Sequence, residues 1–417
     1  MQSMNGSSGQ NRKGKMKKKL LIVSSSLDTG GAQKMISNIT MALPKEWRAD
    51  ILINSDQNIQ FPYRGKLLSL NVNEPKSRMS LVYQARVLIR RLRMLKRLKK
   101  SNRYCACISL LDSANIANIL SGSKHCKTII TAVCNLSHEK KIKKIRFLVF
   151  PMVRLLYNHA SHIVVQNQDI MDDLTRHFGI RKDKCHIIYN GIDTASVLQK
   201  SRELLDDKDG AWFSRERTII SAGRLSWQKG QWHLIRAFHQ VRQKIPDAKL
   251  VIYGEGELKD YLNQLIKDYD MADAAVLKPF DTELDKYIGN SAVFAFPSMM
   301  EGMPTVLLEA LASGTMVAVT DFESGAREIL DYADTERLTK TAWTKYGVIT
   351  PLCSGEMRSA LEPLEKQEKL LAEALTTCLL DPGIREKYSR AGLERSRCFD
   401  METIIHEWIR VVEQEEV

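Results

Sequence analysis

The stretch Glu301-Gly-Met-Pro-Thr-Val-Leu-Leu-Glu309 contains two carboxylates eight positions apart. An apolar run at 292–296 precedes it, and a helix-like run at 307–312 continues from it. This order predicts a strand, a tight loop and the start of a helix, whose free N–H groups and dipole suit a phosphate. Glu301 is then accessible in the loop, and Glu309 lies about two turns further on. We therefore expect one acid to hold a sugar hydroxyl and the other a ribose diol.

Outside this stretch, apolar runs alternate with helix-like segments along the chain. Strands are expected at 20–24, 49–54, 104–111, 128–134, 162–166, 187–189, 218–222, 250–253, 292–296 and 316–320. Between them, helices are expected, and a charged stretch at 194–217 interrupts the alternation as an irregular linker. A helical segment at 401–415 closes the chain. The pattern predicts two α/β domains with parallel, Rossmann-like sheets and a cleft between them.

The chain of 417 residues is long enough for two domains, and its 44% apolar and 27% charged residues are typical of a globular protein. It contains no apolar run of about 18 residues, as a membrane-spanning helix requires. Residues 1–16 are expected to be a disordered leader. The eight cysteines include no Cys-x-x-Cys pair, so we expect reduced thiols, a cytoplasmic location and no metal site.

Charge is distributed unevenly between the two halves. Residues 1–150 carry 29 Lys and Arg against 7 Asp and Glu, whereas the remainder carries 33 against 42. A basic first half predicts an anionic partner, for which nucleic acid and a phospholipid surface are the two possibilities.

Three glycine-containing loops follow predicted strands. In 223–230, Arg224 and Lys229 are spaced so that both could reach a diphosphate, although two cations on a surface loop are the plainer interpretation. Gly30 and Gly31 would let the backbone approach a ligand closely, or simply form an ordinary turn. The loop 254–257 begins Gly254-Glu255 and is equally compatible with a turn before a helix. No Gly-x-Gly-x-x-Gly pattern supports a dinucleotide cofactor.

Together, the loop with Arg224 and Lys229 and the Glu301-x7-Glu309 signature resemble the retaining, nucleotide-sugar-dependent glycosyltransferases of family four, which have the GT-B fold. The resemblance covers roughly residues 17–408. It implies an N-terminal acceptor domain at 17–195, a nucleotide-sugar domain at 196–399 and a C-terminal helix, 400–417, that crosses back to the first domain.

The resemblance also implies roles for individual residues. Arg224 and Lys229 would neutralise the departing diphosphate, and Glu301 would orient the donor sugar without a metal or other cofactor. A UDP-sugar is the favoured co-substrate. The donor would be bound by Gly30, Gly31, Gly223, Gly254, Glu255, Gly302, Met303, Pro304, Thr305, Val306 and Glu309.

The acceptor side departs from the family pattern. Many relatives carry a histidine just after a strand of the first domain, where this chain has Val133 or Cys134. Either Asn135 or His138 is a substitute on the acceptor side, although a loop histidine is more often a surface residue.

The segment 80–100 predicts a long basic amphipathic helix, and Lys140–Arg146 adds a second basic cluster. Leucines recur at helical spacing in this helix, and eight cations between Arg86 and Lys100 surround them without an acid. Such a pattern suits an anionic bilayer surface, or else a solvated helix that packs its leucines on the core. We expect a peripheral enzyme on the inner face of the cell membrane that acts on a polyprenyl-pyrophosphate-linked saccharide.

Three other readings stay open at this point. A GT-B enzyme similar to glycogen synthase or phosphorylase would use a soluble acceptor. A nucleic-acid-binding protein would account for the basic half, although no helix-turn-helix, zinc finger or aromatic RNA-binding signature is present, so no nucleic acid is expected. An adaptor with a vestigial donor site would bind membranes and ignore nucleotide sugars.

Overall fold

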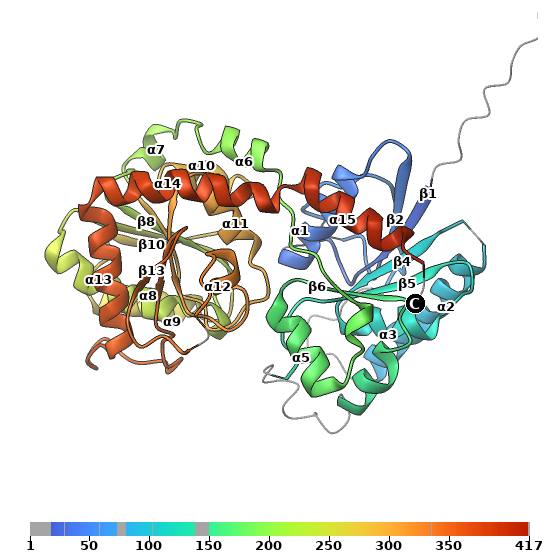
Figure 1. The fold of residues 1–417 in the computed structure, drawn as a ribbon. Helices are drawn as coiled ribbons and strands as arrows, with labels where there is room; N and C mark the ends of the chain where they lie inside the picture. The colour runs from blue at the N-terminus through green and yellow to red at the C-terminus, as the bar shows by residue number, and fades with distance from the viewer. Residues whose placement is uncertain are drawn as a thin grey trace, which may run out of the picture.

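A computed structural model shows two α/β domains, each built on a seven-stranded sheet (Figure 1). It describes residues 18–28, 30–57, 59–72, 81–101, 103–137, 150–334 and 336–415. The expected leader, His138 and the Lys140–Arg146 cluster lie outside these residues.

The first sheet is parallel throughout, in the order β3-β2-β1-β4-β5-β6-β7. Its strands are β1 (Lys18–Val23), β2 (Trp47–Ile53), β3 (Lys66–Ser69), β4 (Ala106–Leu110), β5 (Lys127–Ala132), β6 (His162–Val165) and β7 (Cys185–Ile187). The strands β1, β2, β4, β5 and β6 are mostly apolar and buried, as a parallel sheet covered by helices requires, although Lys18 of β1 and Arg48 of β2 are exposed.

Helices cover both faces of this sheet (Figure 1). They are α1 (Gly31–Ala42), α2 (Leu81–Lys100), α3 (Asp112–Leu120), a helical stretch at 150–157, α5 (Gln168–Phe178) and the short η1 (Lys182–Lys184). Helix α5 has its ends defined by the sequence: Asn167 accepts a hydrogen bond from the Ile170 N–H, and Gly179 ends the helix in the left-handed conformation.

The second sheet has the order β10-β9-β8-β11-β12-β14-β13, and only β13 runs antiparallel to its neighbour. Its strands are β8 (Thr218–Ala222), β9 (Lys249–Tyr253), β10 (Ala275–Lys278), β11 (Val293–Phe296), β12 (Met316–Thr320), β13 (Ala342–Trp343) and β14 (Val348–Thr350). Strand order reverses at β8 and β11, and ligands in such sheets bind beyond the carboxyl ends at that point.

The helices of the second domain are α6 (Thr194–Lys200), α7 (Asp207–Gly210), η2 (Trp227–Lys229), α8 (Gln231–Lys244), α9 (Lys259–Asp268), α10 (Leu284–Gly289), α11 (Thr305–Ala312), α12 (Ala326–Ile329), α13 (Lys366–Leu380), α14 (Pro382–Ser396) and η3 (Arg397–Phe399). The prediction of an irregular linker at 194–217 was wrong, because α6 and α7 lie there. Asp193 and Asp206 begin these helices by accepting backbone N–H bonds, so Asp206, one of the charged residues that suggested a linker, is a helix cap.

The final helix, α15 (Met401–Glu413), returns to the first domain (Figure 1). Its buried side chains, Ile404 and Trp408 among them, share one core with Ile36 of α1 and the strands β1, β2 and β4. The crossing is held where Ile192 donates to the Phe399 carbonyl at 2.9 Å and Met401 donates to the Ile192 carbonyl at 2.8 Å.

Helix α2 is amphipathic, but its cations are not all solvated as expected. Leu95 is buried against the sheet, whereas Arg91 and Lys99 are each only 1% exposed. Arg91 donates to Asn54 at 2.7 Å and to Ser113 at 2.9 Å, and burial lowers the pKa of its guanidinium to about 10. Lys99 donates to the Asn118 carbonyl at 2.8 Å. Both cations are therefore structural.

The remaining cations of α2 form an exposed stripe along one side of the helix: Arg86, Arg90, Arg93, Lys96, Arg97 and Lys100. Among the described residues, no helix combines the length and the apolar character needed to cross a bilayer.

Candidate active site

The two residues singled out most strongly by the sequence lie side by side. Lys229 ends η2 in the loop after β8, and Glu301 lies in the loop between β11 and α11. The Lys229 Nζ atom is 2.6 Å from the Glu301 Oε1 atom and 4.8 Å from the centre of the Phe296 ring. Both side chains are largely buried, at 17% and 8% exposure. A shielded cation and a carboxylate are thus held at the carboxyl ends of adjacent strands.

The two loops that carry this pair are bonded to each other. Met299 donates to the Gln228 carbonyl at 2.8 Å, and the Gln228 side chain donates to the Met300 carbonyl at 2.8 Å. Gly230 permits the close packing, because a Cβ atom there would lie 2.3 Å from the Pro297 carbonyl oxygen. The spacing of Lys229 and Glu301 is therefore set by backbone contacts and not by their ion pair alone.

Two helix N-termini point into the same space. Helix α11 begins at Thr305 after Pro304, and α1 begins at Gly31 after Gly30. A Cβ atom on Gly31 would lie 4.0 Å from the Thr305 Oγ1 atom, which is buried and has no hydrogen-bond partner within the described part of the chain. Free N–H groups and the positive ends of two helix dipoles thus converge on one point between the domains, as an anion such as a diphosphate requires.

Glu309 is buried on α11 and forms an ion pair with Lys34 of α1, across the boundary between the domains. Asp285 of α10 is a second buried carboxyl in this neighbourhood. Burial and the charge of Glu309 raise the pKa of Asp285 to about 7, against the opposing effect of Lys34 and Lys200. Sequence reasoning missed Lys34 and Asp285, although Lys34 follows directly on the glycine loop.

Amide side chains of the first domain hold the backbone of the signature loop. Asn167 donates to the Gly302 carbonyl at 2.8 Å, and Asn190 donates to the Met303 carbonyl at 2.6 Å. Gln166 donates to Asn190 at 2.8 Å, and all three amides are buried. Sequence reasoning missed these positioning residues. The available signal was their place directly after β6 and β7, at the edge that faces the cleft.

The other loops named from the sequence lie around this centre. Gly223 and Gly254 have positive φ angles of 152° and 154°, and a Cβ atom on Gly254 would lie 2.0 Å from the Gly223 carbonyl oxygen. These glycines thus allow two loops to touch, whatever else they do. Glu255 pairs with Lys259 at 3.0 Å on the surface, and Arg224 is exposed in the same loop as Lys229.

On the acceptor side, the chain after β5 reaches the signature loop. A Cβ atom on Gly302 would lie 2.0 Å from the Val133 carbonyl oxygen, so Val133 contributes backbone where relatives have a histidine. Asn135 is buried, and its Oδ1 atom has no hydrogen-bond partner among the described residues. A cavity of about 630 Å³ lies in the second domain, with Trp227 and Met300 in its wall.

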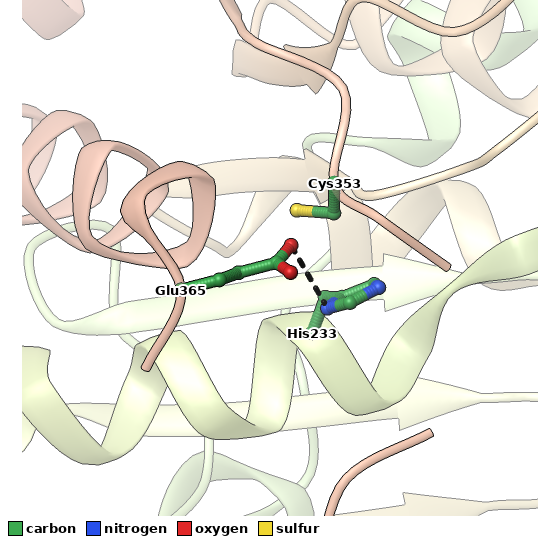
Figure 2. Close-up of side chains that lie close together, drawn as sticks. All are labelled: His233, Cys353 and Glu365. Atoms are coloured by element: carbon green, nitrogen blue, oxygen red, sulfur yellow. Dashed lines mark ion pairs between the residues drawn. The ribbon is translucent and has the colours of Figure 1, made fainter. Parts of the chain in front are cut away.

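His233, Cys353 and Glu365 form a separate buried cluster whose donor atoms lie within 4.8 Å of one another (Figure 2). The His233 Nδ1 atom is 2.8 Å from the Glu368 Oε1 atom, and its Nε2 atom accepts a hydrogen bond from the Gly355 N–H at 3.2 Å. Both imidazole nitrogens are therefore already used. We interpret the cluster as a bond between α8 and α13 and not as a metal site.

Two family models match the chain, each on one domain. Residues 29–196 match "Glycosyltransferase Family 4", and residues 204–345 match "Glycosyl transferases group 1". A protein of Methanocaldococcus jannaschii described as an uncharacterized glycosyltransferase is 31% identical over 81% of this chain and 86% of its own length. The chain therefore belongs to the family-four glycosyltransferases, as the sequence resemblance predicted.

A second relative and the solved structures extend this result. The Campylobacter jejuni "N-acetylgalactosamine-N,N'-diacetylbacillosaminyl-diphospho-undecaprenol 4-alpha-N-acetylgalactosaminyltransferase" is 33% identical over 60% of this chain and 59% of its own length. The structure of Anabaena HepE with UDP and glucose superposes with a TM-score of 0.71 and 18% identity, over 95% of this chain and 99% of the other. The structure of Staphylococcus aureus TarM superposes with a TM-score of 0.71 and 13% identity, over 95% of this chain and 100% of the other. These similarities confirm the GT-B fold.

Proposed function

We propose that this glycosyltransferase moves a sugar, with retention of configuration and without a metal, from a UDP-sugar to a lipid-linked saccharide. The observation that carries the proposal is the shielded Lys229–Glu301 pair beside the converging N-termini of α1 and α11. A nucleotide diphosphate supplies the negative charge that this centre is built to receive.

In this mechanism the protein acts mainly through fixed charge. Lys229 and Arg224 neutralise the charge that develops on the diphosphate as the bond to the sugar breaks. Backbone N–H groups of the first turn of α11 donate to the same oxygens. Glu301, which is buried and already positioned by Lys229, accepts hydrogen bonds from hydroxyl groups of the donor sugar. Glu309 accepts hydrogen bonds from the ribose diol once its carboxylate is shared between Lys34 and the ribose.

The acceptor is proposed to be a saccharide linked to a polyprenyl diphosphate at the inner face of the membrane. The Campylobacter relative supports this choice, because its name specifies a diphospho-undecaprenol-linked acceptor. The exposed basic stripe of α2 supplies a surface for anionic lipid. Retention of configuration rests on the family, and UDP as the nucleotide is supported by the HepE complex.

The test is thermal stabilisation by UDP-, GDP- and ADP-sugars of the wild-type protein, Lys229→Ala and Lys244→Ala. Lys244 is an exposed lysine at the end of α8 and serves as the matched control. A ligand at 100 times its dissociation constant stabilises a fold by about 2.7 kcal/mol. We expect UDP-sugars to stabilise the wild type and Lys244→Ala but not Lys229→Ala.

Stabilisation by another nucleotide series would replace UDP in the proposal. Folded wild-type protein that responds to none of them would overturn the donor site. Transfer to a soluble saccharide, with no preference for a lipid-linked one, would overturn the acceptor.

A further inference from the structure

A second hollow lies at the edge of the first sheet that is remote from the candidate active site. It measures about 830 Å³ and is bounded by the amino-terminal ends of β1, β2 and β3. Strand β2 rises about 3.3 Å per residue, so its seven residues separate the hollow from the cleft edge by roughly 20 Å. A diphosphate bound between the domains does not reach it.

The hollow is lined mainly by cations. Lys45, Arg48 and Lys66 are exposed and form no hydrogen bond or ion pair through their side chains with any described residue. Arg64 donates to the Leu43 carbonyl and keeps its charge. Gly65, with a φ angle of 136°, sets these side chains close to β2, because a Cβ atom there would lie 1.8 Å from the Ala49 carbonyl oxygen.

The one acid in the lining, Asp50, is already occupied. It is buried, lies 2.7 Å from the Lys19 Nζ atom, and accepts a hydrogen bond from the Tyr104 hydroxyl at 2.6 Å. Asp50 therefore balances Lys19 and leaves the charges of Lys45, Arg48, Arg64 and Lys66 uncompensated. Uncompensated cations around a hollow attract an anion.

Trp47 forms part of the same wall. Trp47 is only 3% exposed and lines the hollow, yet its indole N–H makes no hydrogen bond to any described residue. Lys18 lies over the Trp47 ring, 5.2 Å from its centre. The indole N–H can only donate, so an acceptor that enters this hollow would meet an open donor as well as cations.

The chain that leaves the basic end of α2 returns to the edge of the sheet where the hollow lies. Helix α2 ends at Lys100, and the chain then returns to the same edge of the sheet, where the Cys105 N–H donates to the Lys19 carbonyl at 2.9 Å. Lys96, Arg97 and Lys100 are exposed at this end of the helix. The chain thus carries two basic features, the hollow and the end of α2, that are joined through five residues at this edge.

We propose that this hollow binds the phosphate of an anionic lipid headgroup, with Arg48 and Lys66 as its charged ligands and the Trp47 indole N–H as a hydrogen-bond donor. Arginine supplies a fork and lysine a point charge, the pair of donors that phosphate oxygens accept. The hollow would then be one of the sites through which the protein contacts the membrane. This inference rests on the proposed function only in assuming that the protein acts at a bilayer.

The test uses the full chain in sedimentation with phosphatidylcholine vesicles, made with and without phosphatidylglycerol. The test variant is Lys45→Gln with Arg48→Gln and Lys66→Gln. The matched control removes three equally exposed cations of the second domain, Arg202→Gln, Lys267→Gln and Lys369→Gln. Each cation near an anionic surface contributes about 1 kcal/mol, or roughly fivefold in binding, so we expect a loss of roughly 100-fold in the test variant. The control should lose little.

A second measurement reports on the hollow directly. Inorganic phosphate, and then short-chain phosphatidylglycerol, is titrated into ¹⁵N-labelled protein while the Trp47 indole resonance, assigned with Trp47→Phe, is followed. The proposal predicts a shift with the lipid that is absent in the test variant. Equal vesicle binding by the test variant and the wild type would overturn the proposal. A shift of the Trp47 resonance with inorganic phosphate but not with the lipid would also overturn it, because the hollow would then be a site for free phosphate.

Stabilisation by the nucleotide sugar is measured on the same variants. The hollow lies outside the donor site, so the test variant should keep this effect. Loss of lipid binding with donor binding intact, or the reverse, thus separates failure of this proposal from failure of the proposed function.

Discussion

The two domains face each other across the cleft with different chemistry. The second domain presents charged side chains, Lys229, Glu301 and Glu309, at or just beyond the carboxyl ends of its strands. From the corresponding edge of its own sheet, the first domain presents the neutral amides of Asn167 and Asn190, which bond to the backbone of the signature loop. One domain therefore holds the groups that stabilise charge, and the other positions the loop that carries them.

This division explains why the same architecture occurs twice without the same motifs. A parallel sheet with helices on both faces supplies only a platform, and the loops at its carboxyl ends decide what it does. Among the described residues of the first domain, only Lys34, which pairs with Glu309, adds a charge to the centre described above.

The largest effect is expected when a charge is removed from the second domain, because this domain holds the groups that stabilise charge. We expect Lys229→Met to lower kcat/KM by roughly 10³-fold, because a fixed cation at the leaving group is lost. The double variant Lys229→Met with Glu301→Gln should stay as inactive in the same steady-state assay. Recovery of activity in the double variant would mean that the ion pair is structural, and would contradict the role of Lys229 in stabilising charge.

Asp285 tests whether burial or charge dominates beside Glu309. Its pKa is raised from 3.8 to about 7, so the free energy of unfolding should fall as pH rises from about 4 through 7. A pKa difference of about three between the folded and unfolded protein corresponds to a loss of roughly 4 kcal/mol of unfolding free energy at most. Asp285→Asn should remove this loss above pH 7. Urea unfolding of both proteins at pH 5 and pH 8 measures it. A constant difference between them at the two pH values would contradict the assignment.

The amides of the first domain should matter less than the charges. Asn167→Ala and Asn190→Ala each leave a buried carbonyl unpaired, which costs about 1–3 kcal/mol. We expect kcat/KM to fall because the signature loop is displaced. Asn118→Ala, which removes buried hydrogen bonds inside the first domain, is the control and should lower stability while leaving the KM for the donor unchanged. Equal kinetic effects in all three variants would contradict the conclusion that Asn167 and Asn190 position the signature loop.

The smallest expected effect separates two kinds of cation on α2. Arg90→Gln changes an exposed side chain and should alter the free energy of unfolding by less than about 0.5 kcal/mol. Arg91→Gln breaks two buried hydrogen bonds and should cost more. Urea unfolding of the pair tests this, and equal losses would mean that both residues are structural.

Much of the architecture could be predicted from sequence because its signal is local. Apolar runs of strand length alternate with helical periodicity, so the βα repeats and the strand before Glu301 were expected at nearly the right residues. The pairing of Lys229 with Glu301 in space was not stated in advance. Their common role was inferred from the family pattern, and backbone contacts between two loops bring them together.

What sequence reasoning missed depends on contacts between distant segments. The Lys34–Glu309 pair joins helices more than 270 positions apart, and no local pattern reports it. Arg91 and Lys99 lie four residues before and after the buried Leu95 and so share its face of the helix, but their hydrogen-bond partners, Asn54, Ser113 and Asn118, come from distant segments. Asp206 resembled part of a linker because capping residues and solvated residues are of the same types.

Helix α15 also has a consequence for how the chain is made. The core of the first domain contains side chains from α1 and from α15, yet the ribosome makes these helices at opposite ends of the chain. The first domain therefore keeps an open apolar face throughout synthesis of the second and closes it only after α15 has emerged. The half that is made first is completed last, and for that interval it is the part of the chain most exposed to aggregation.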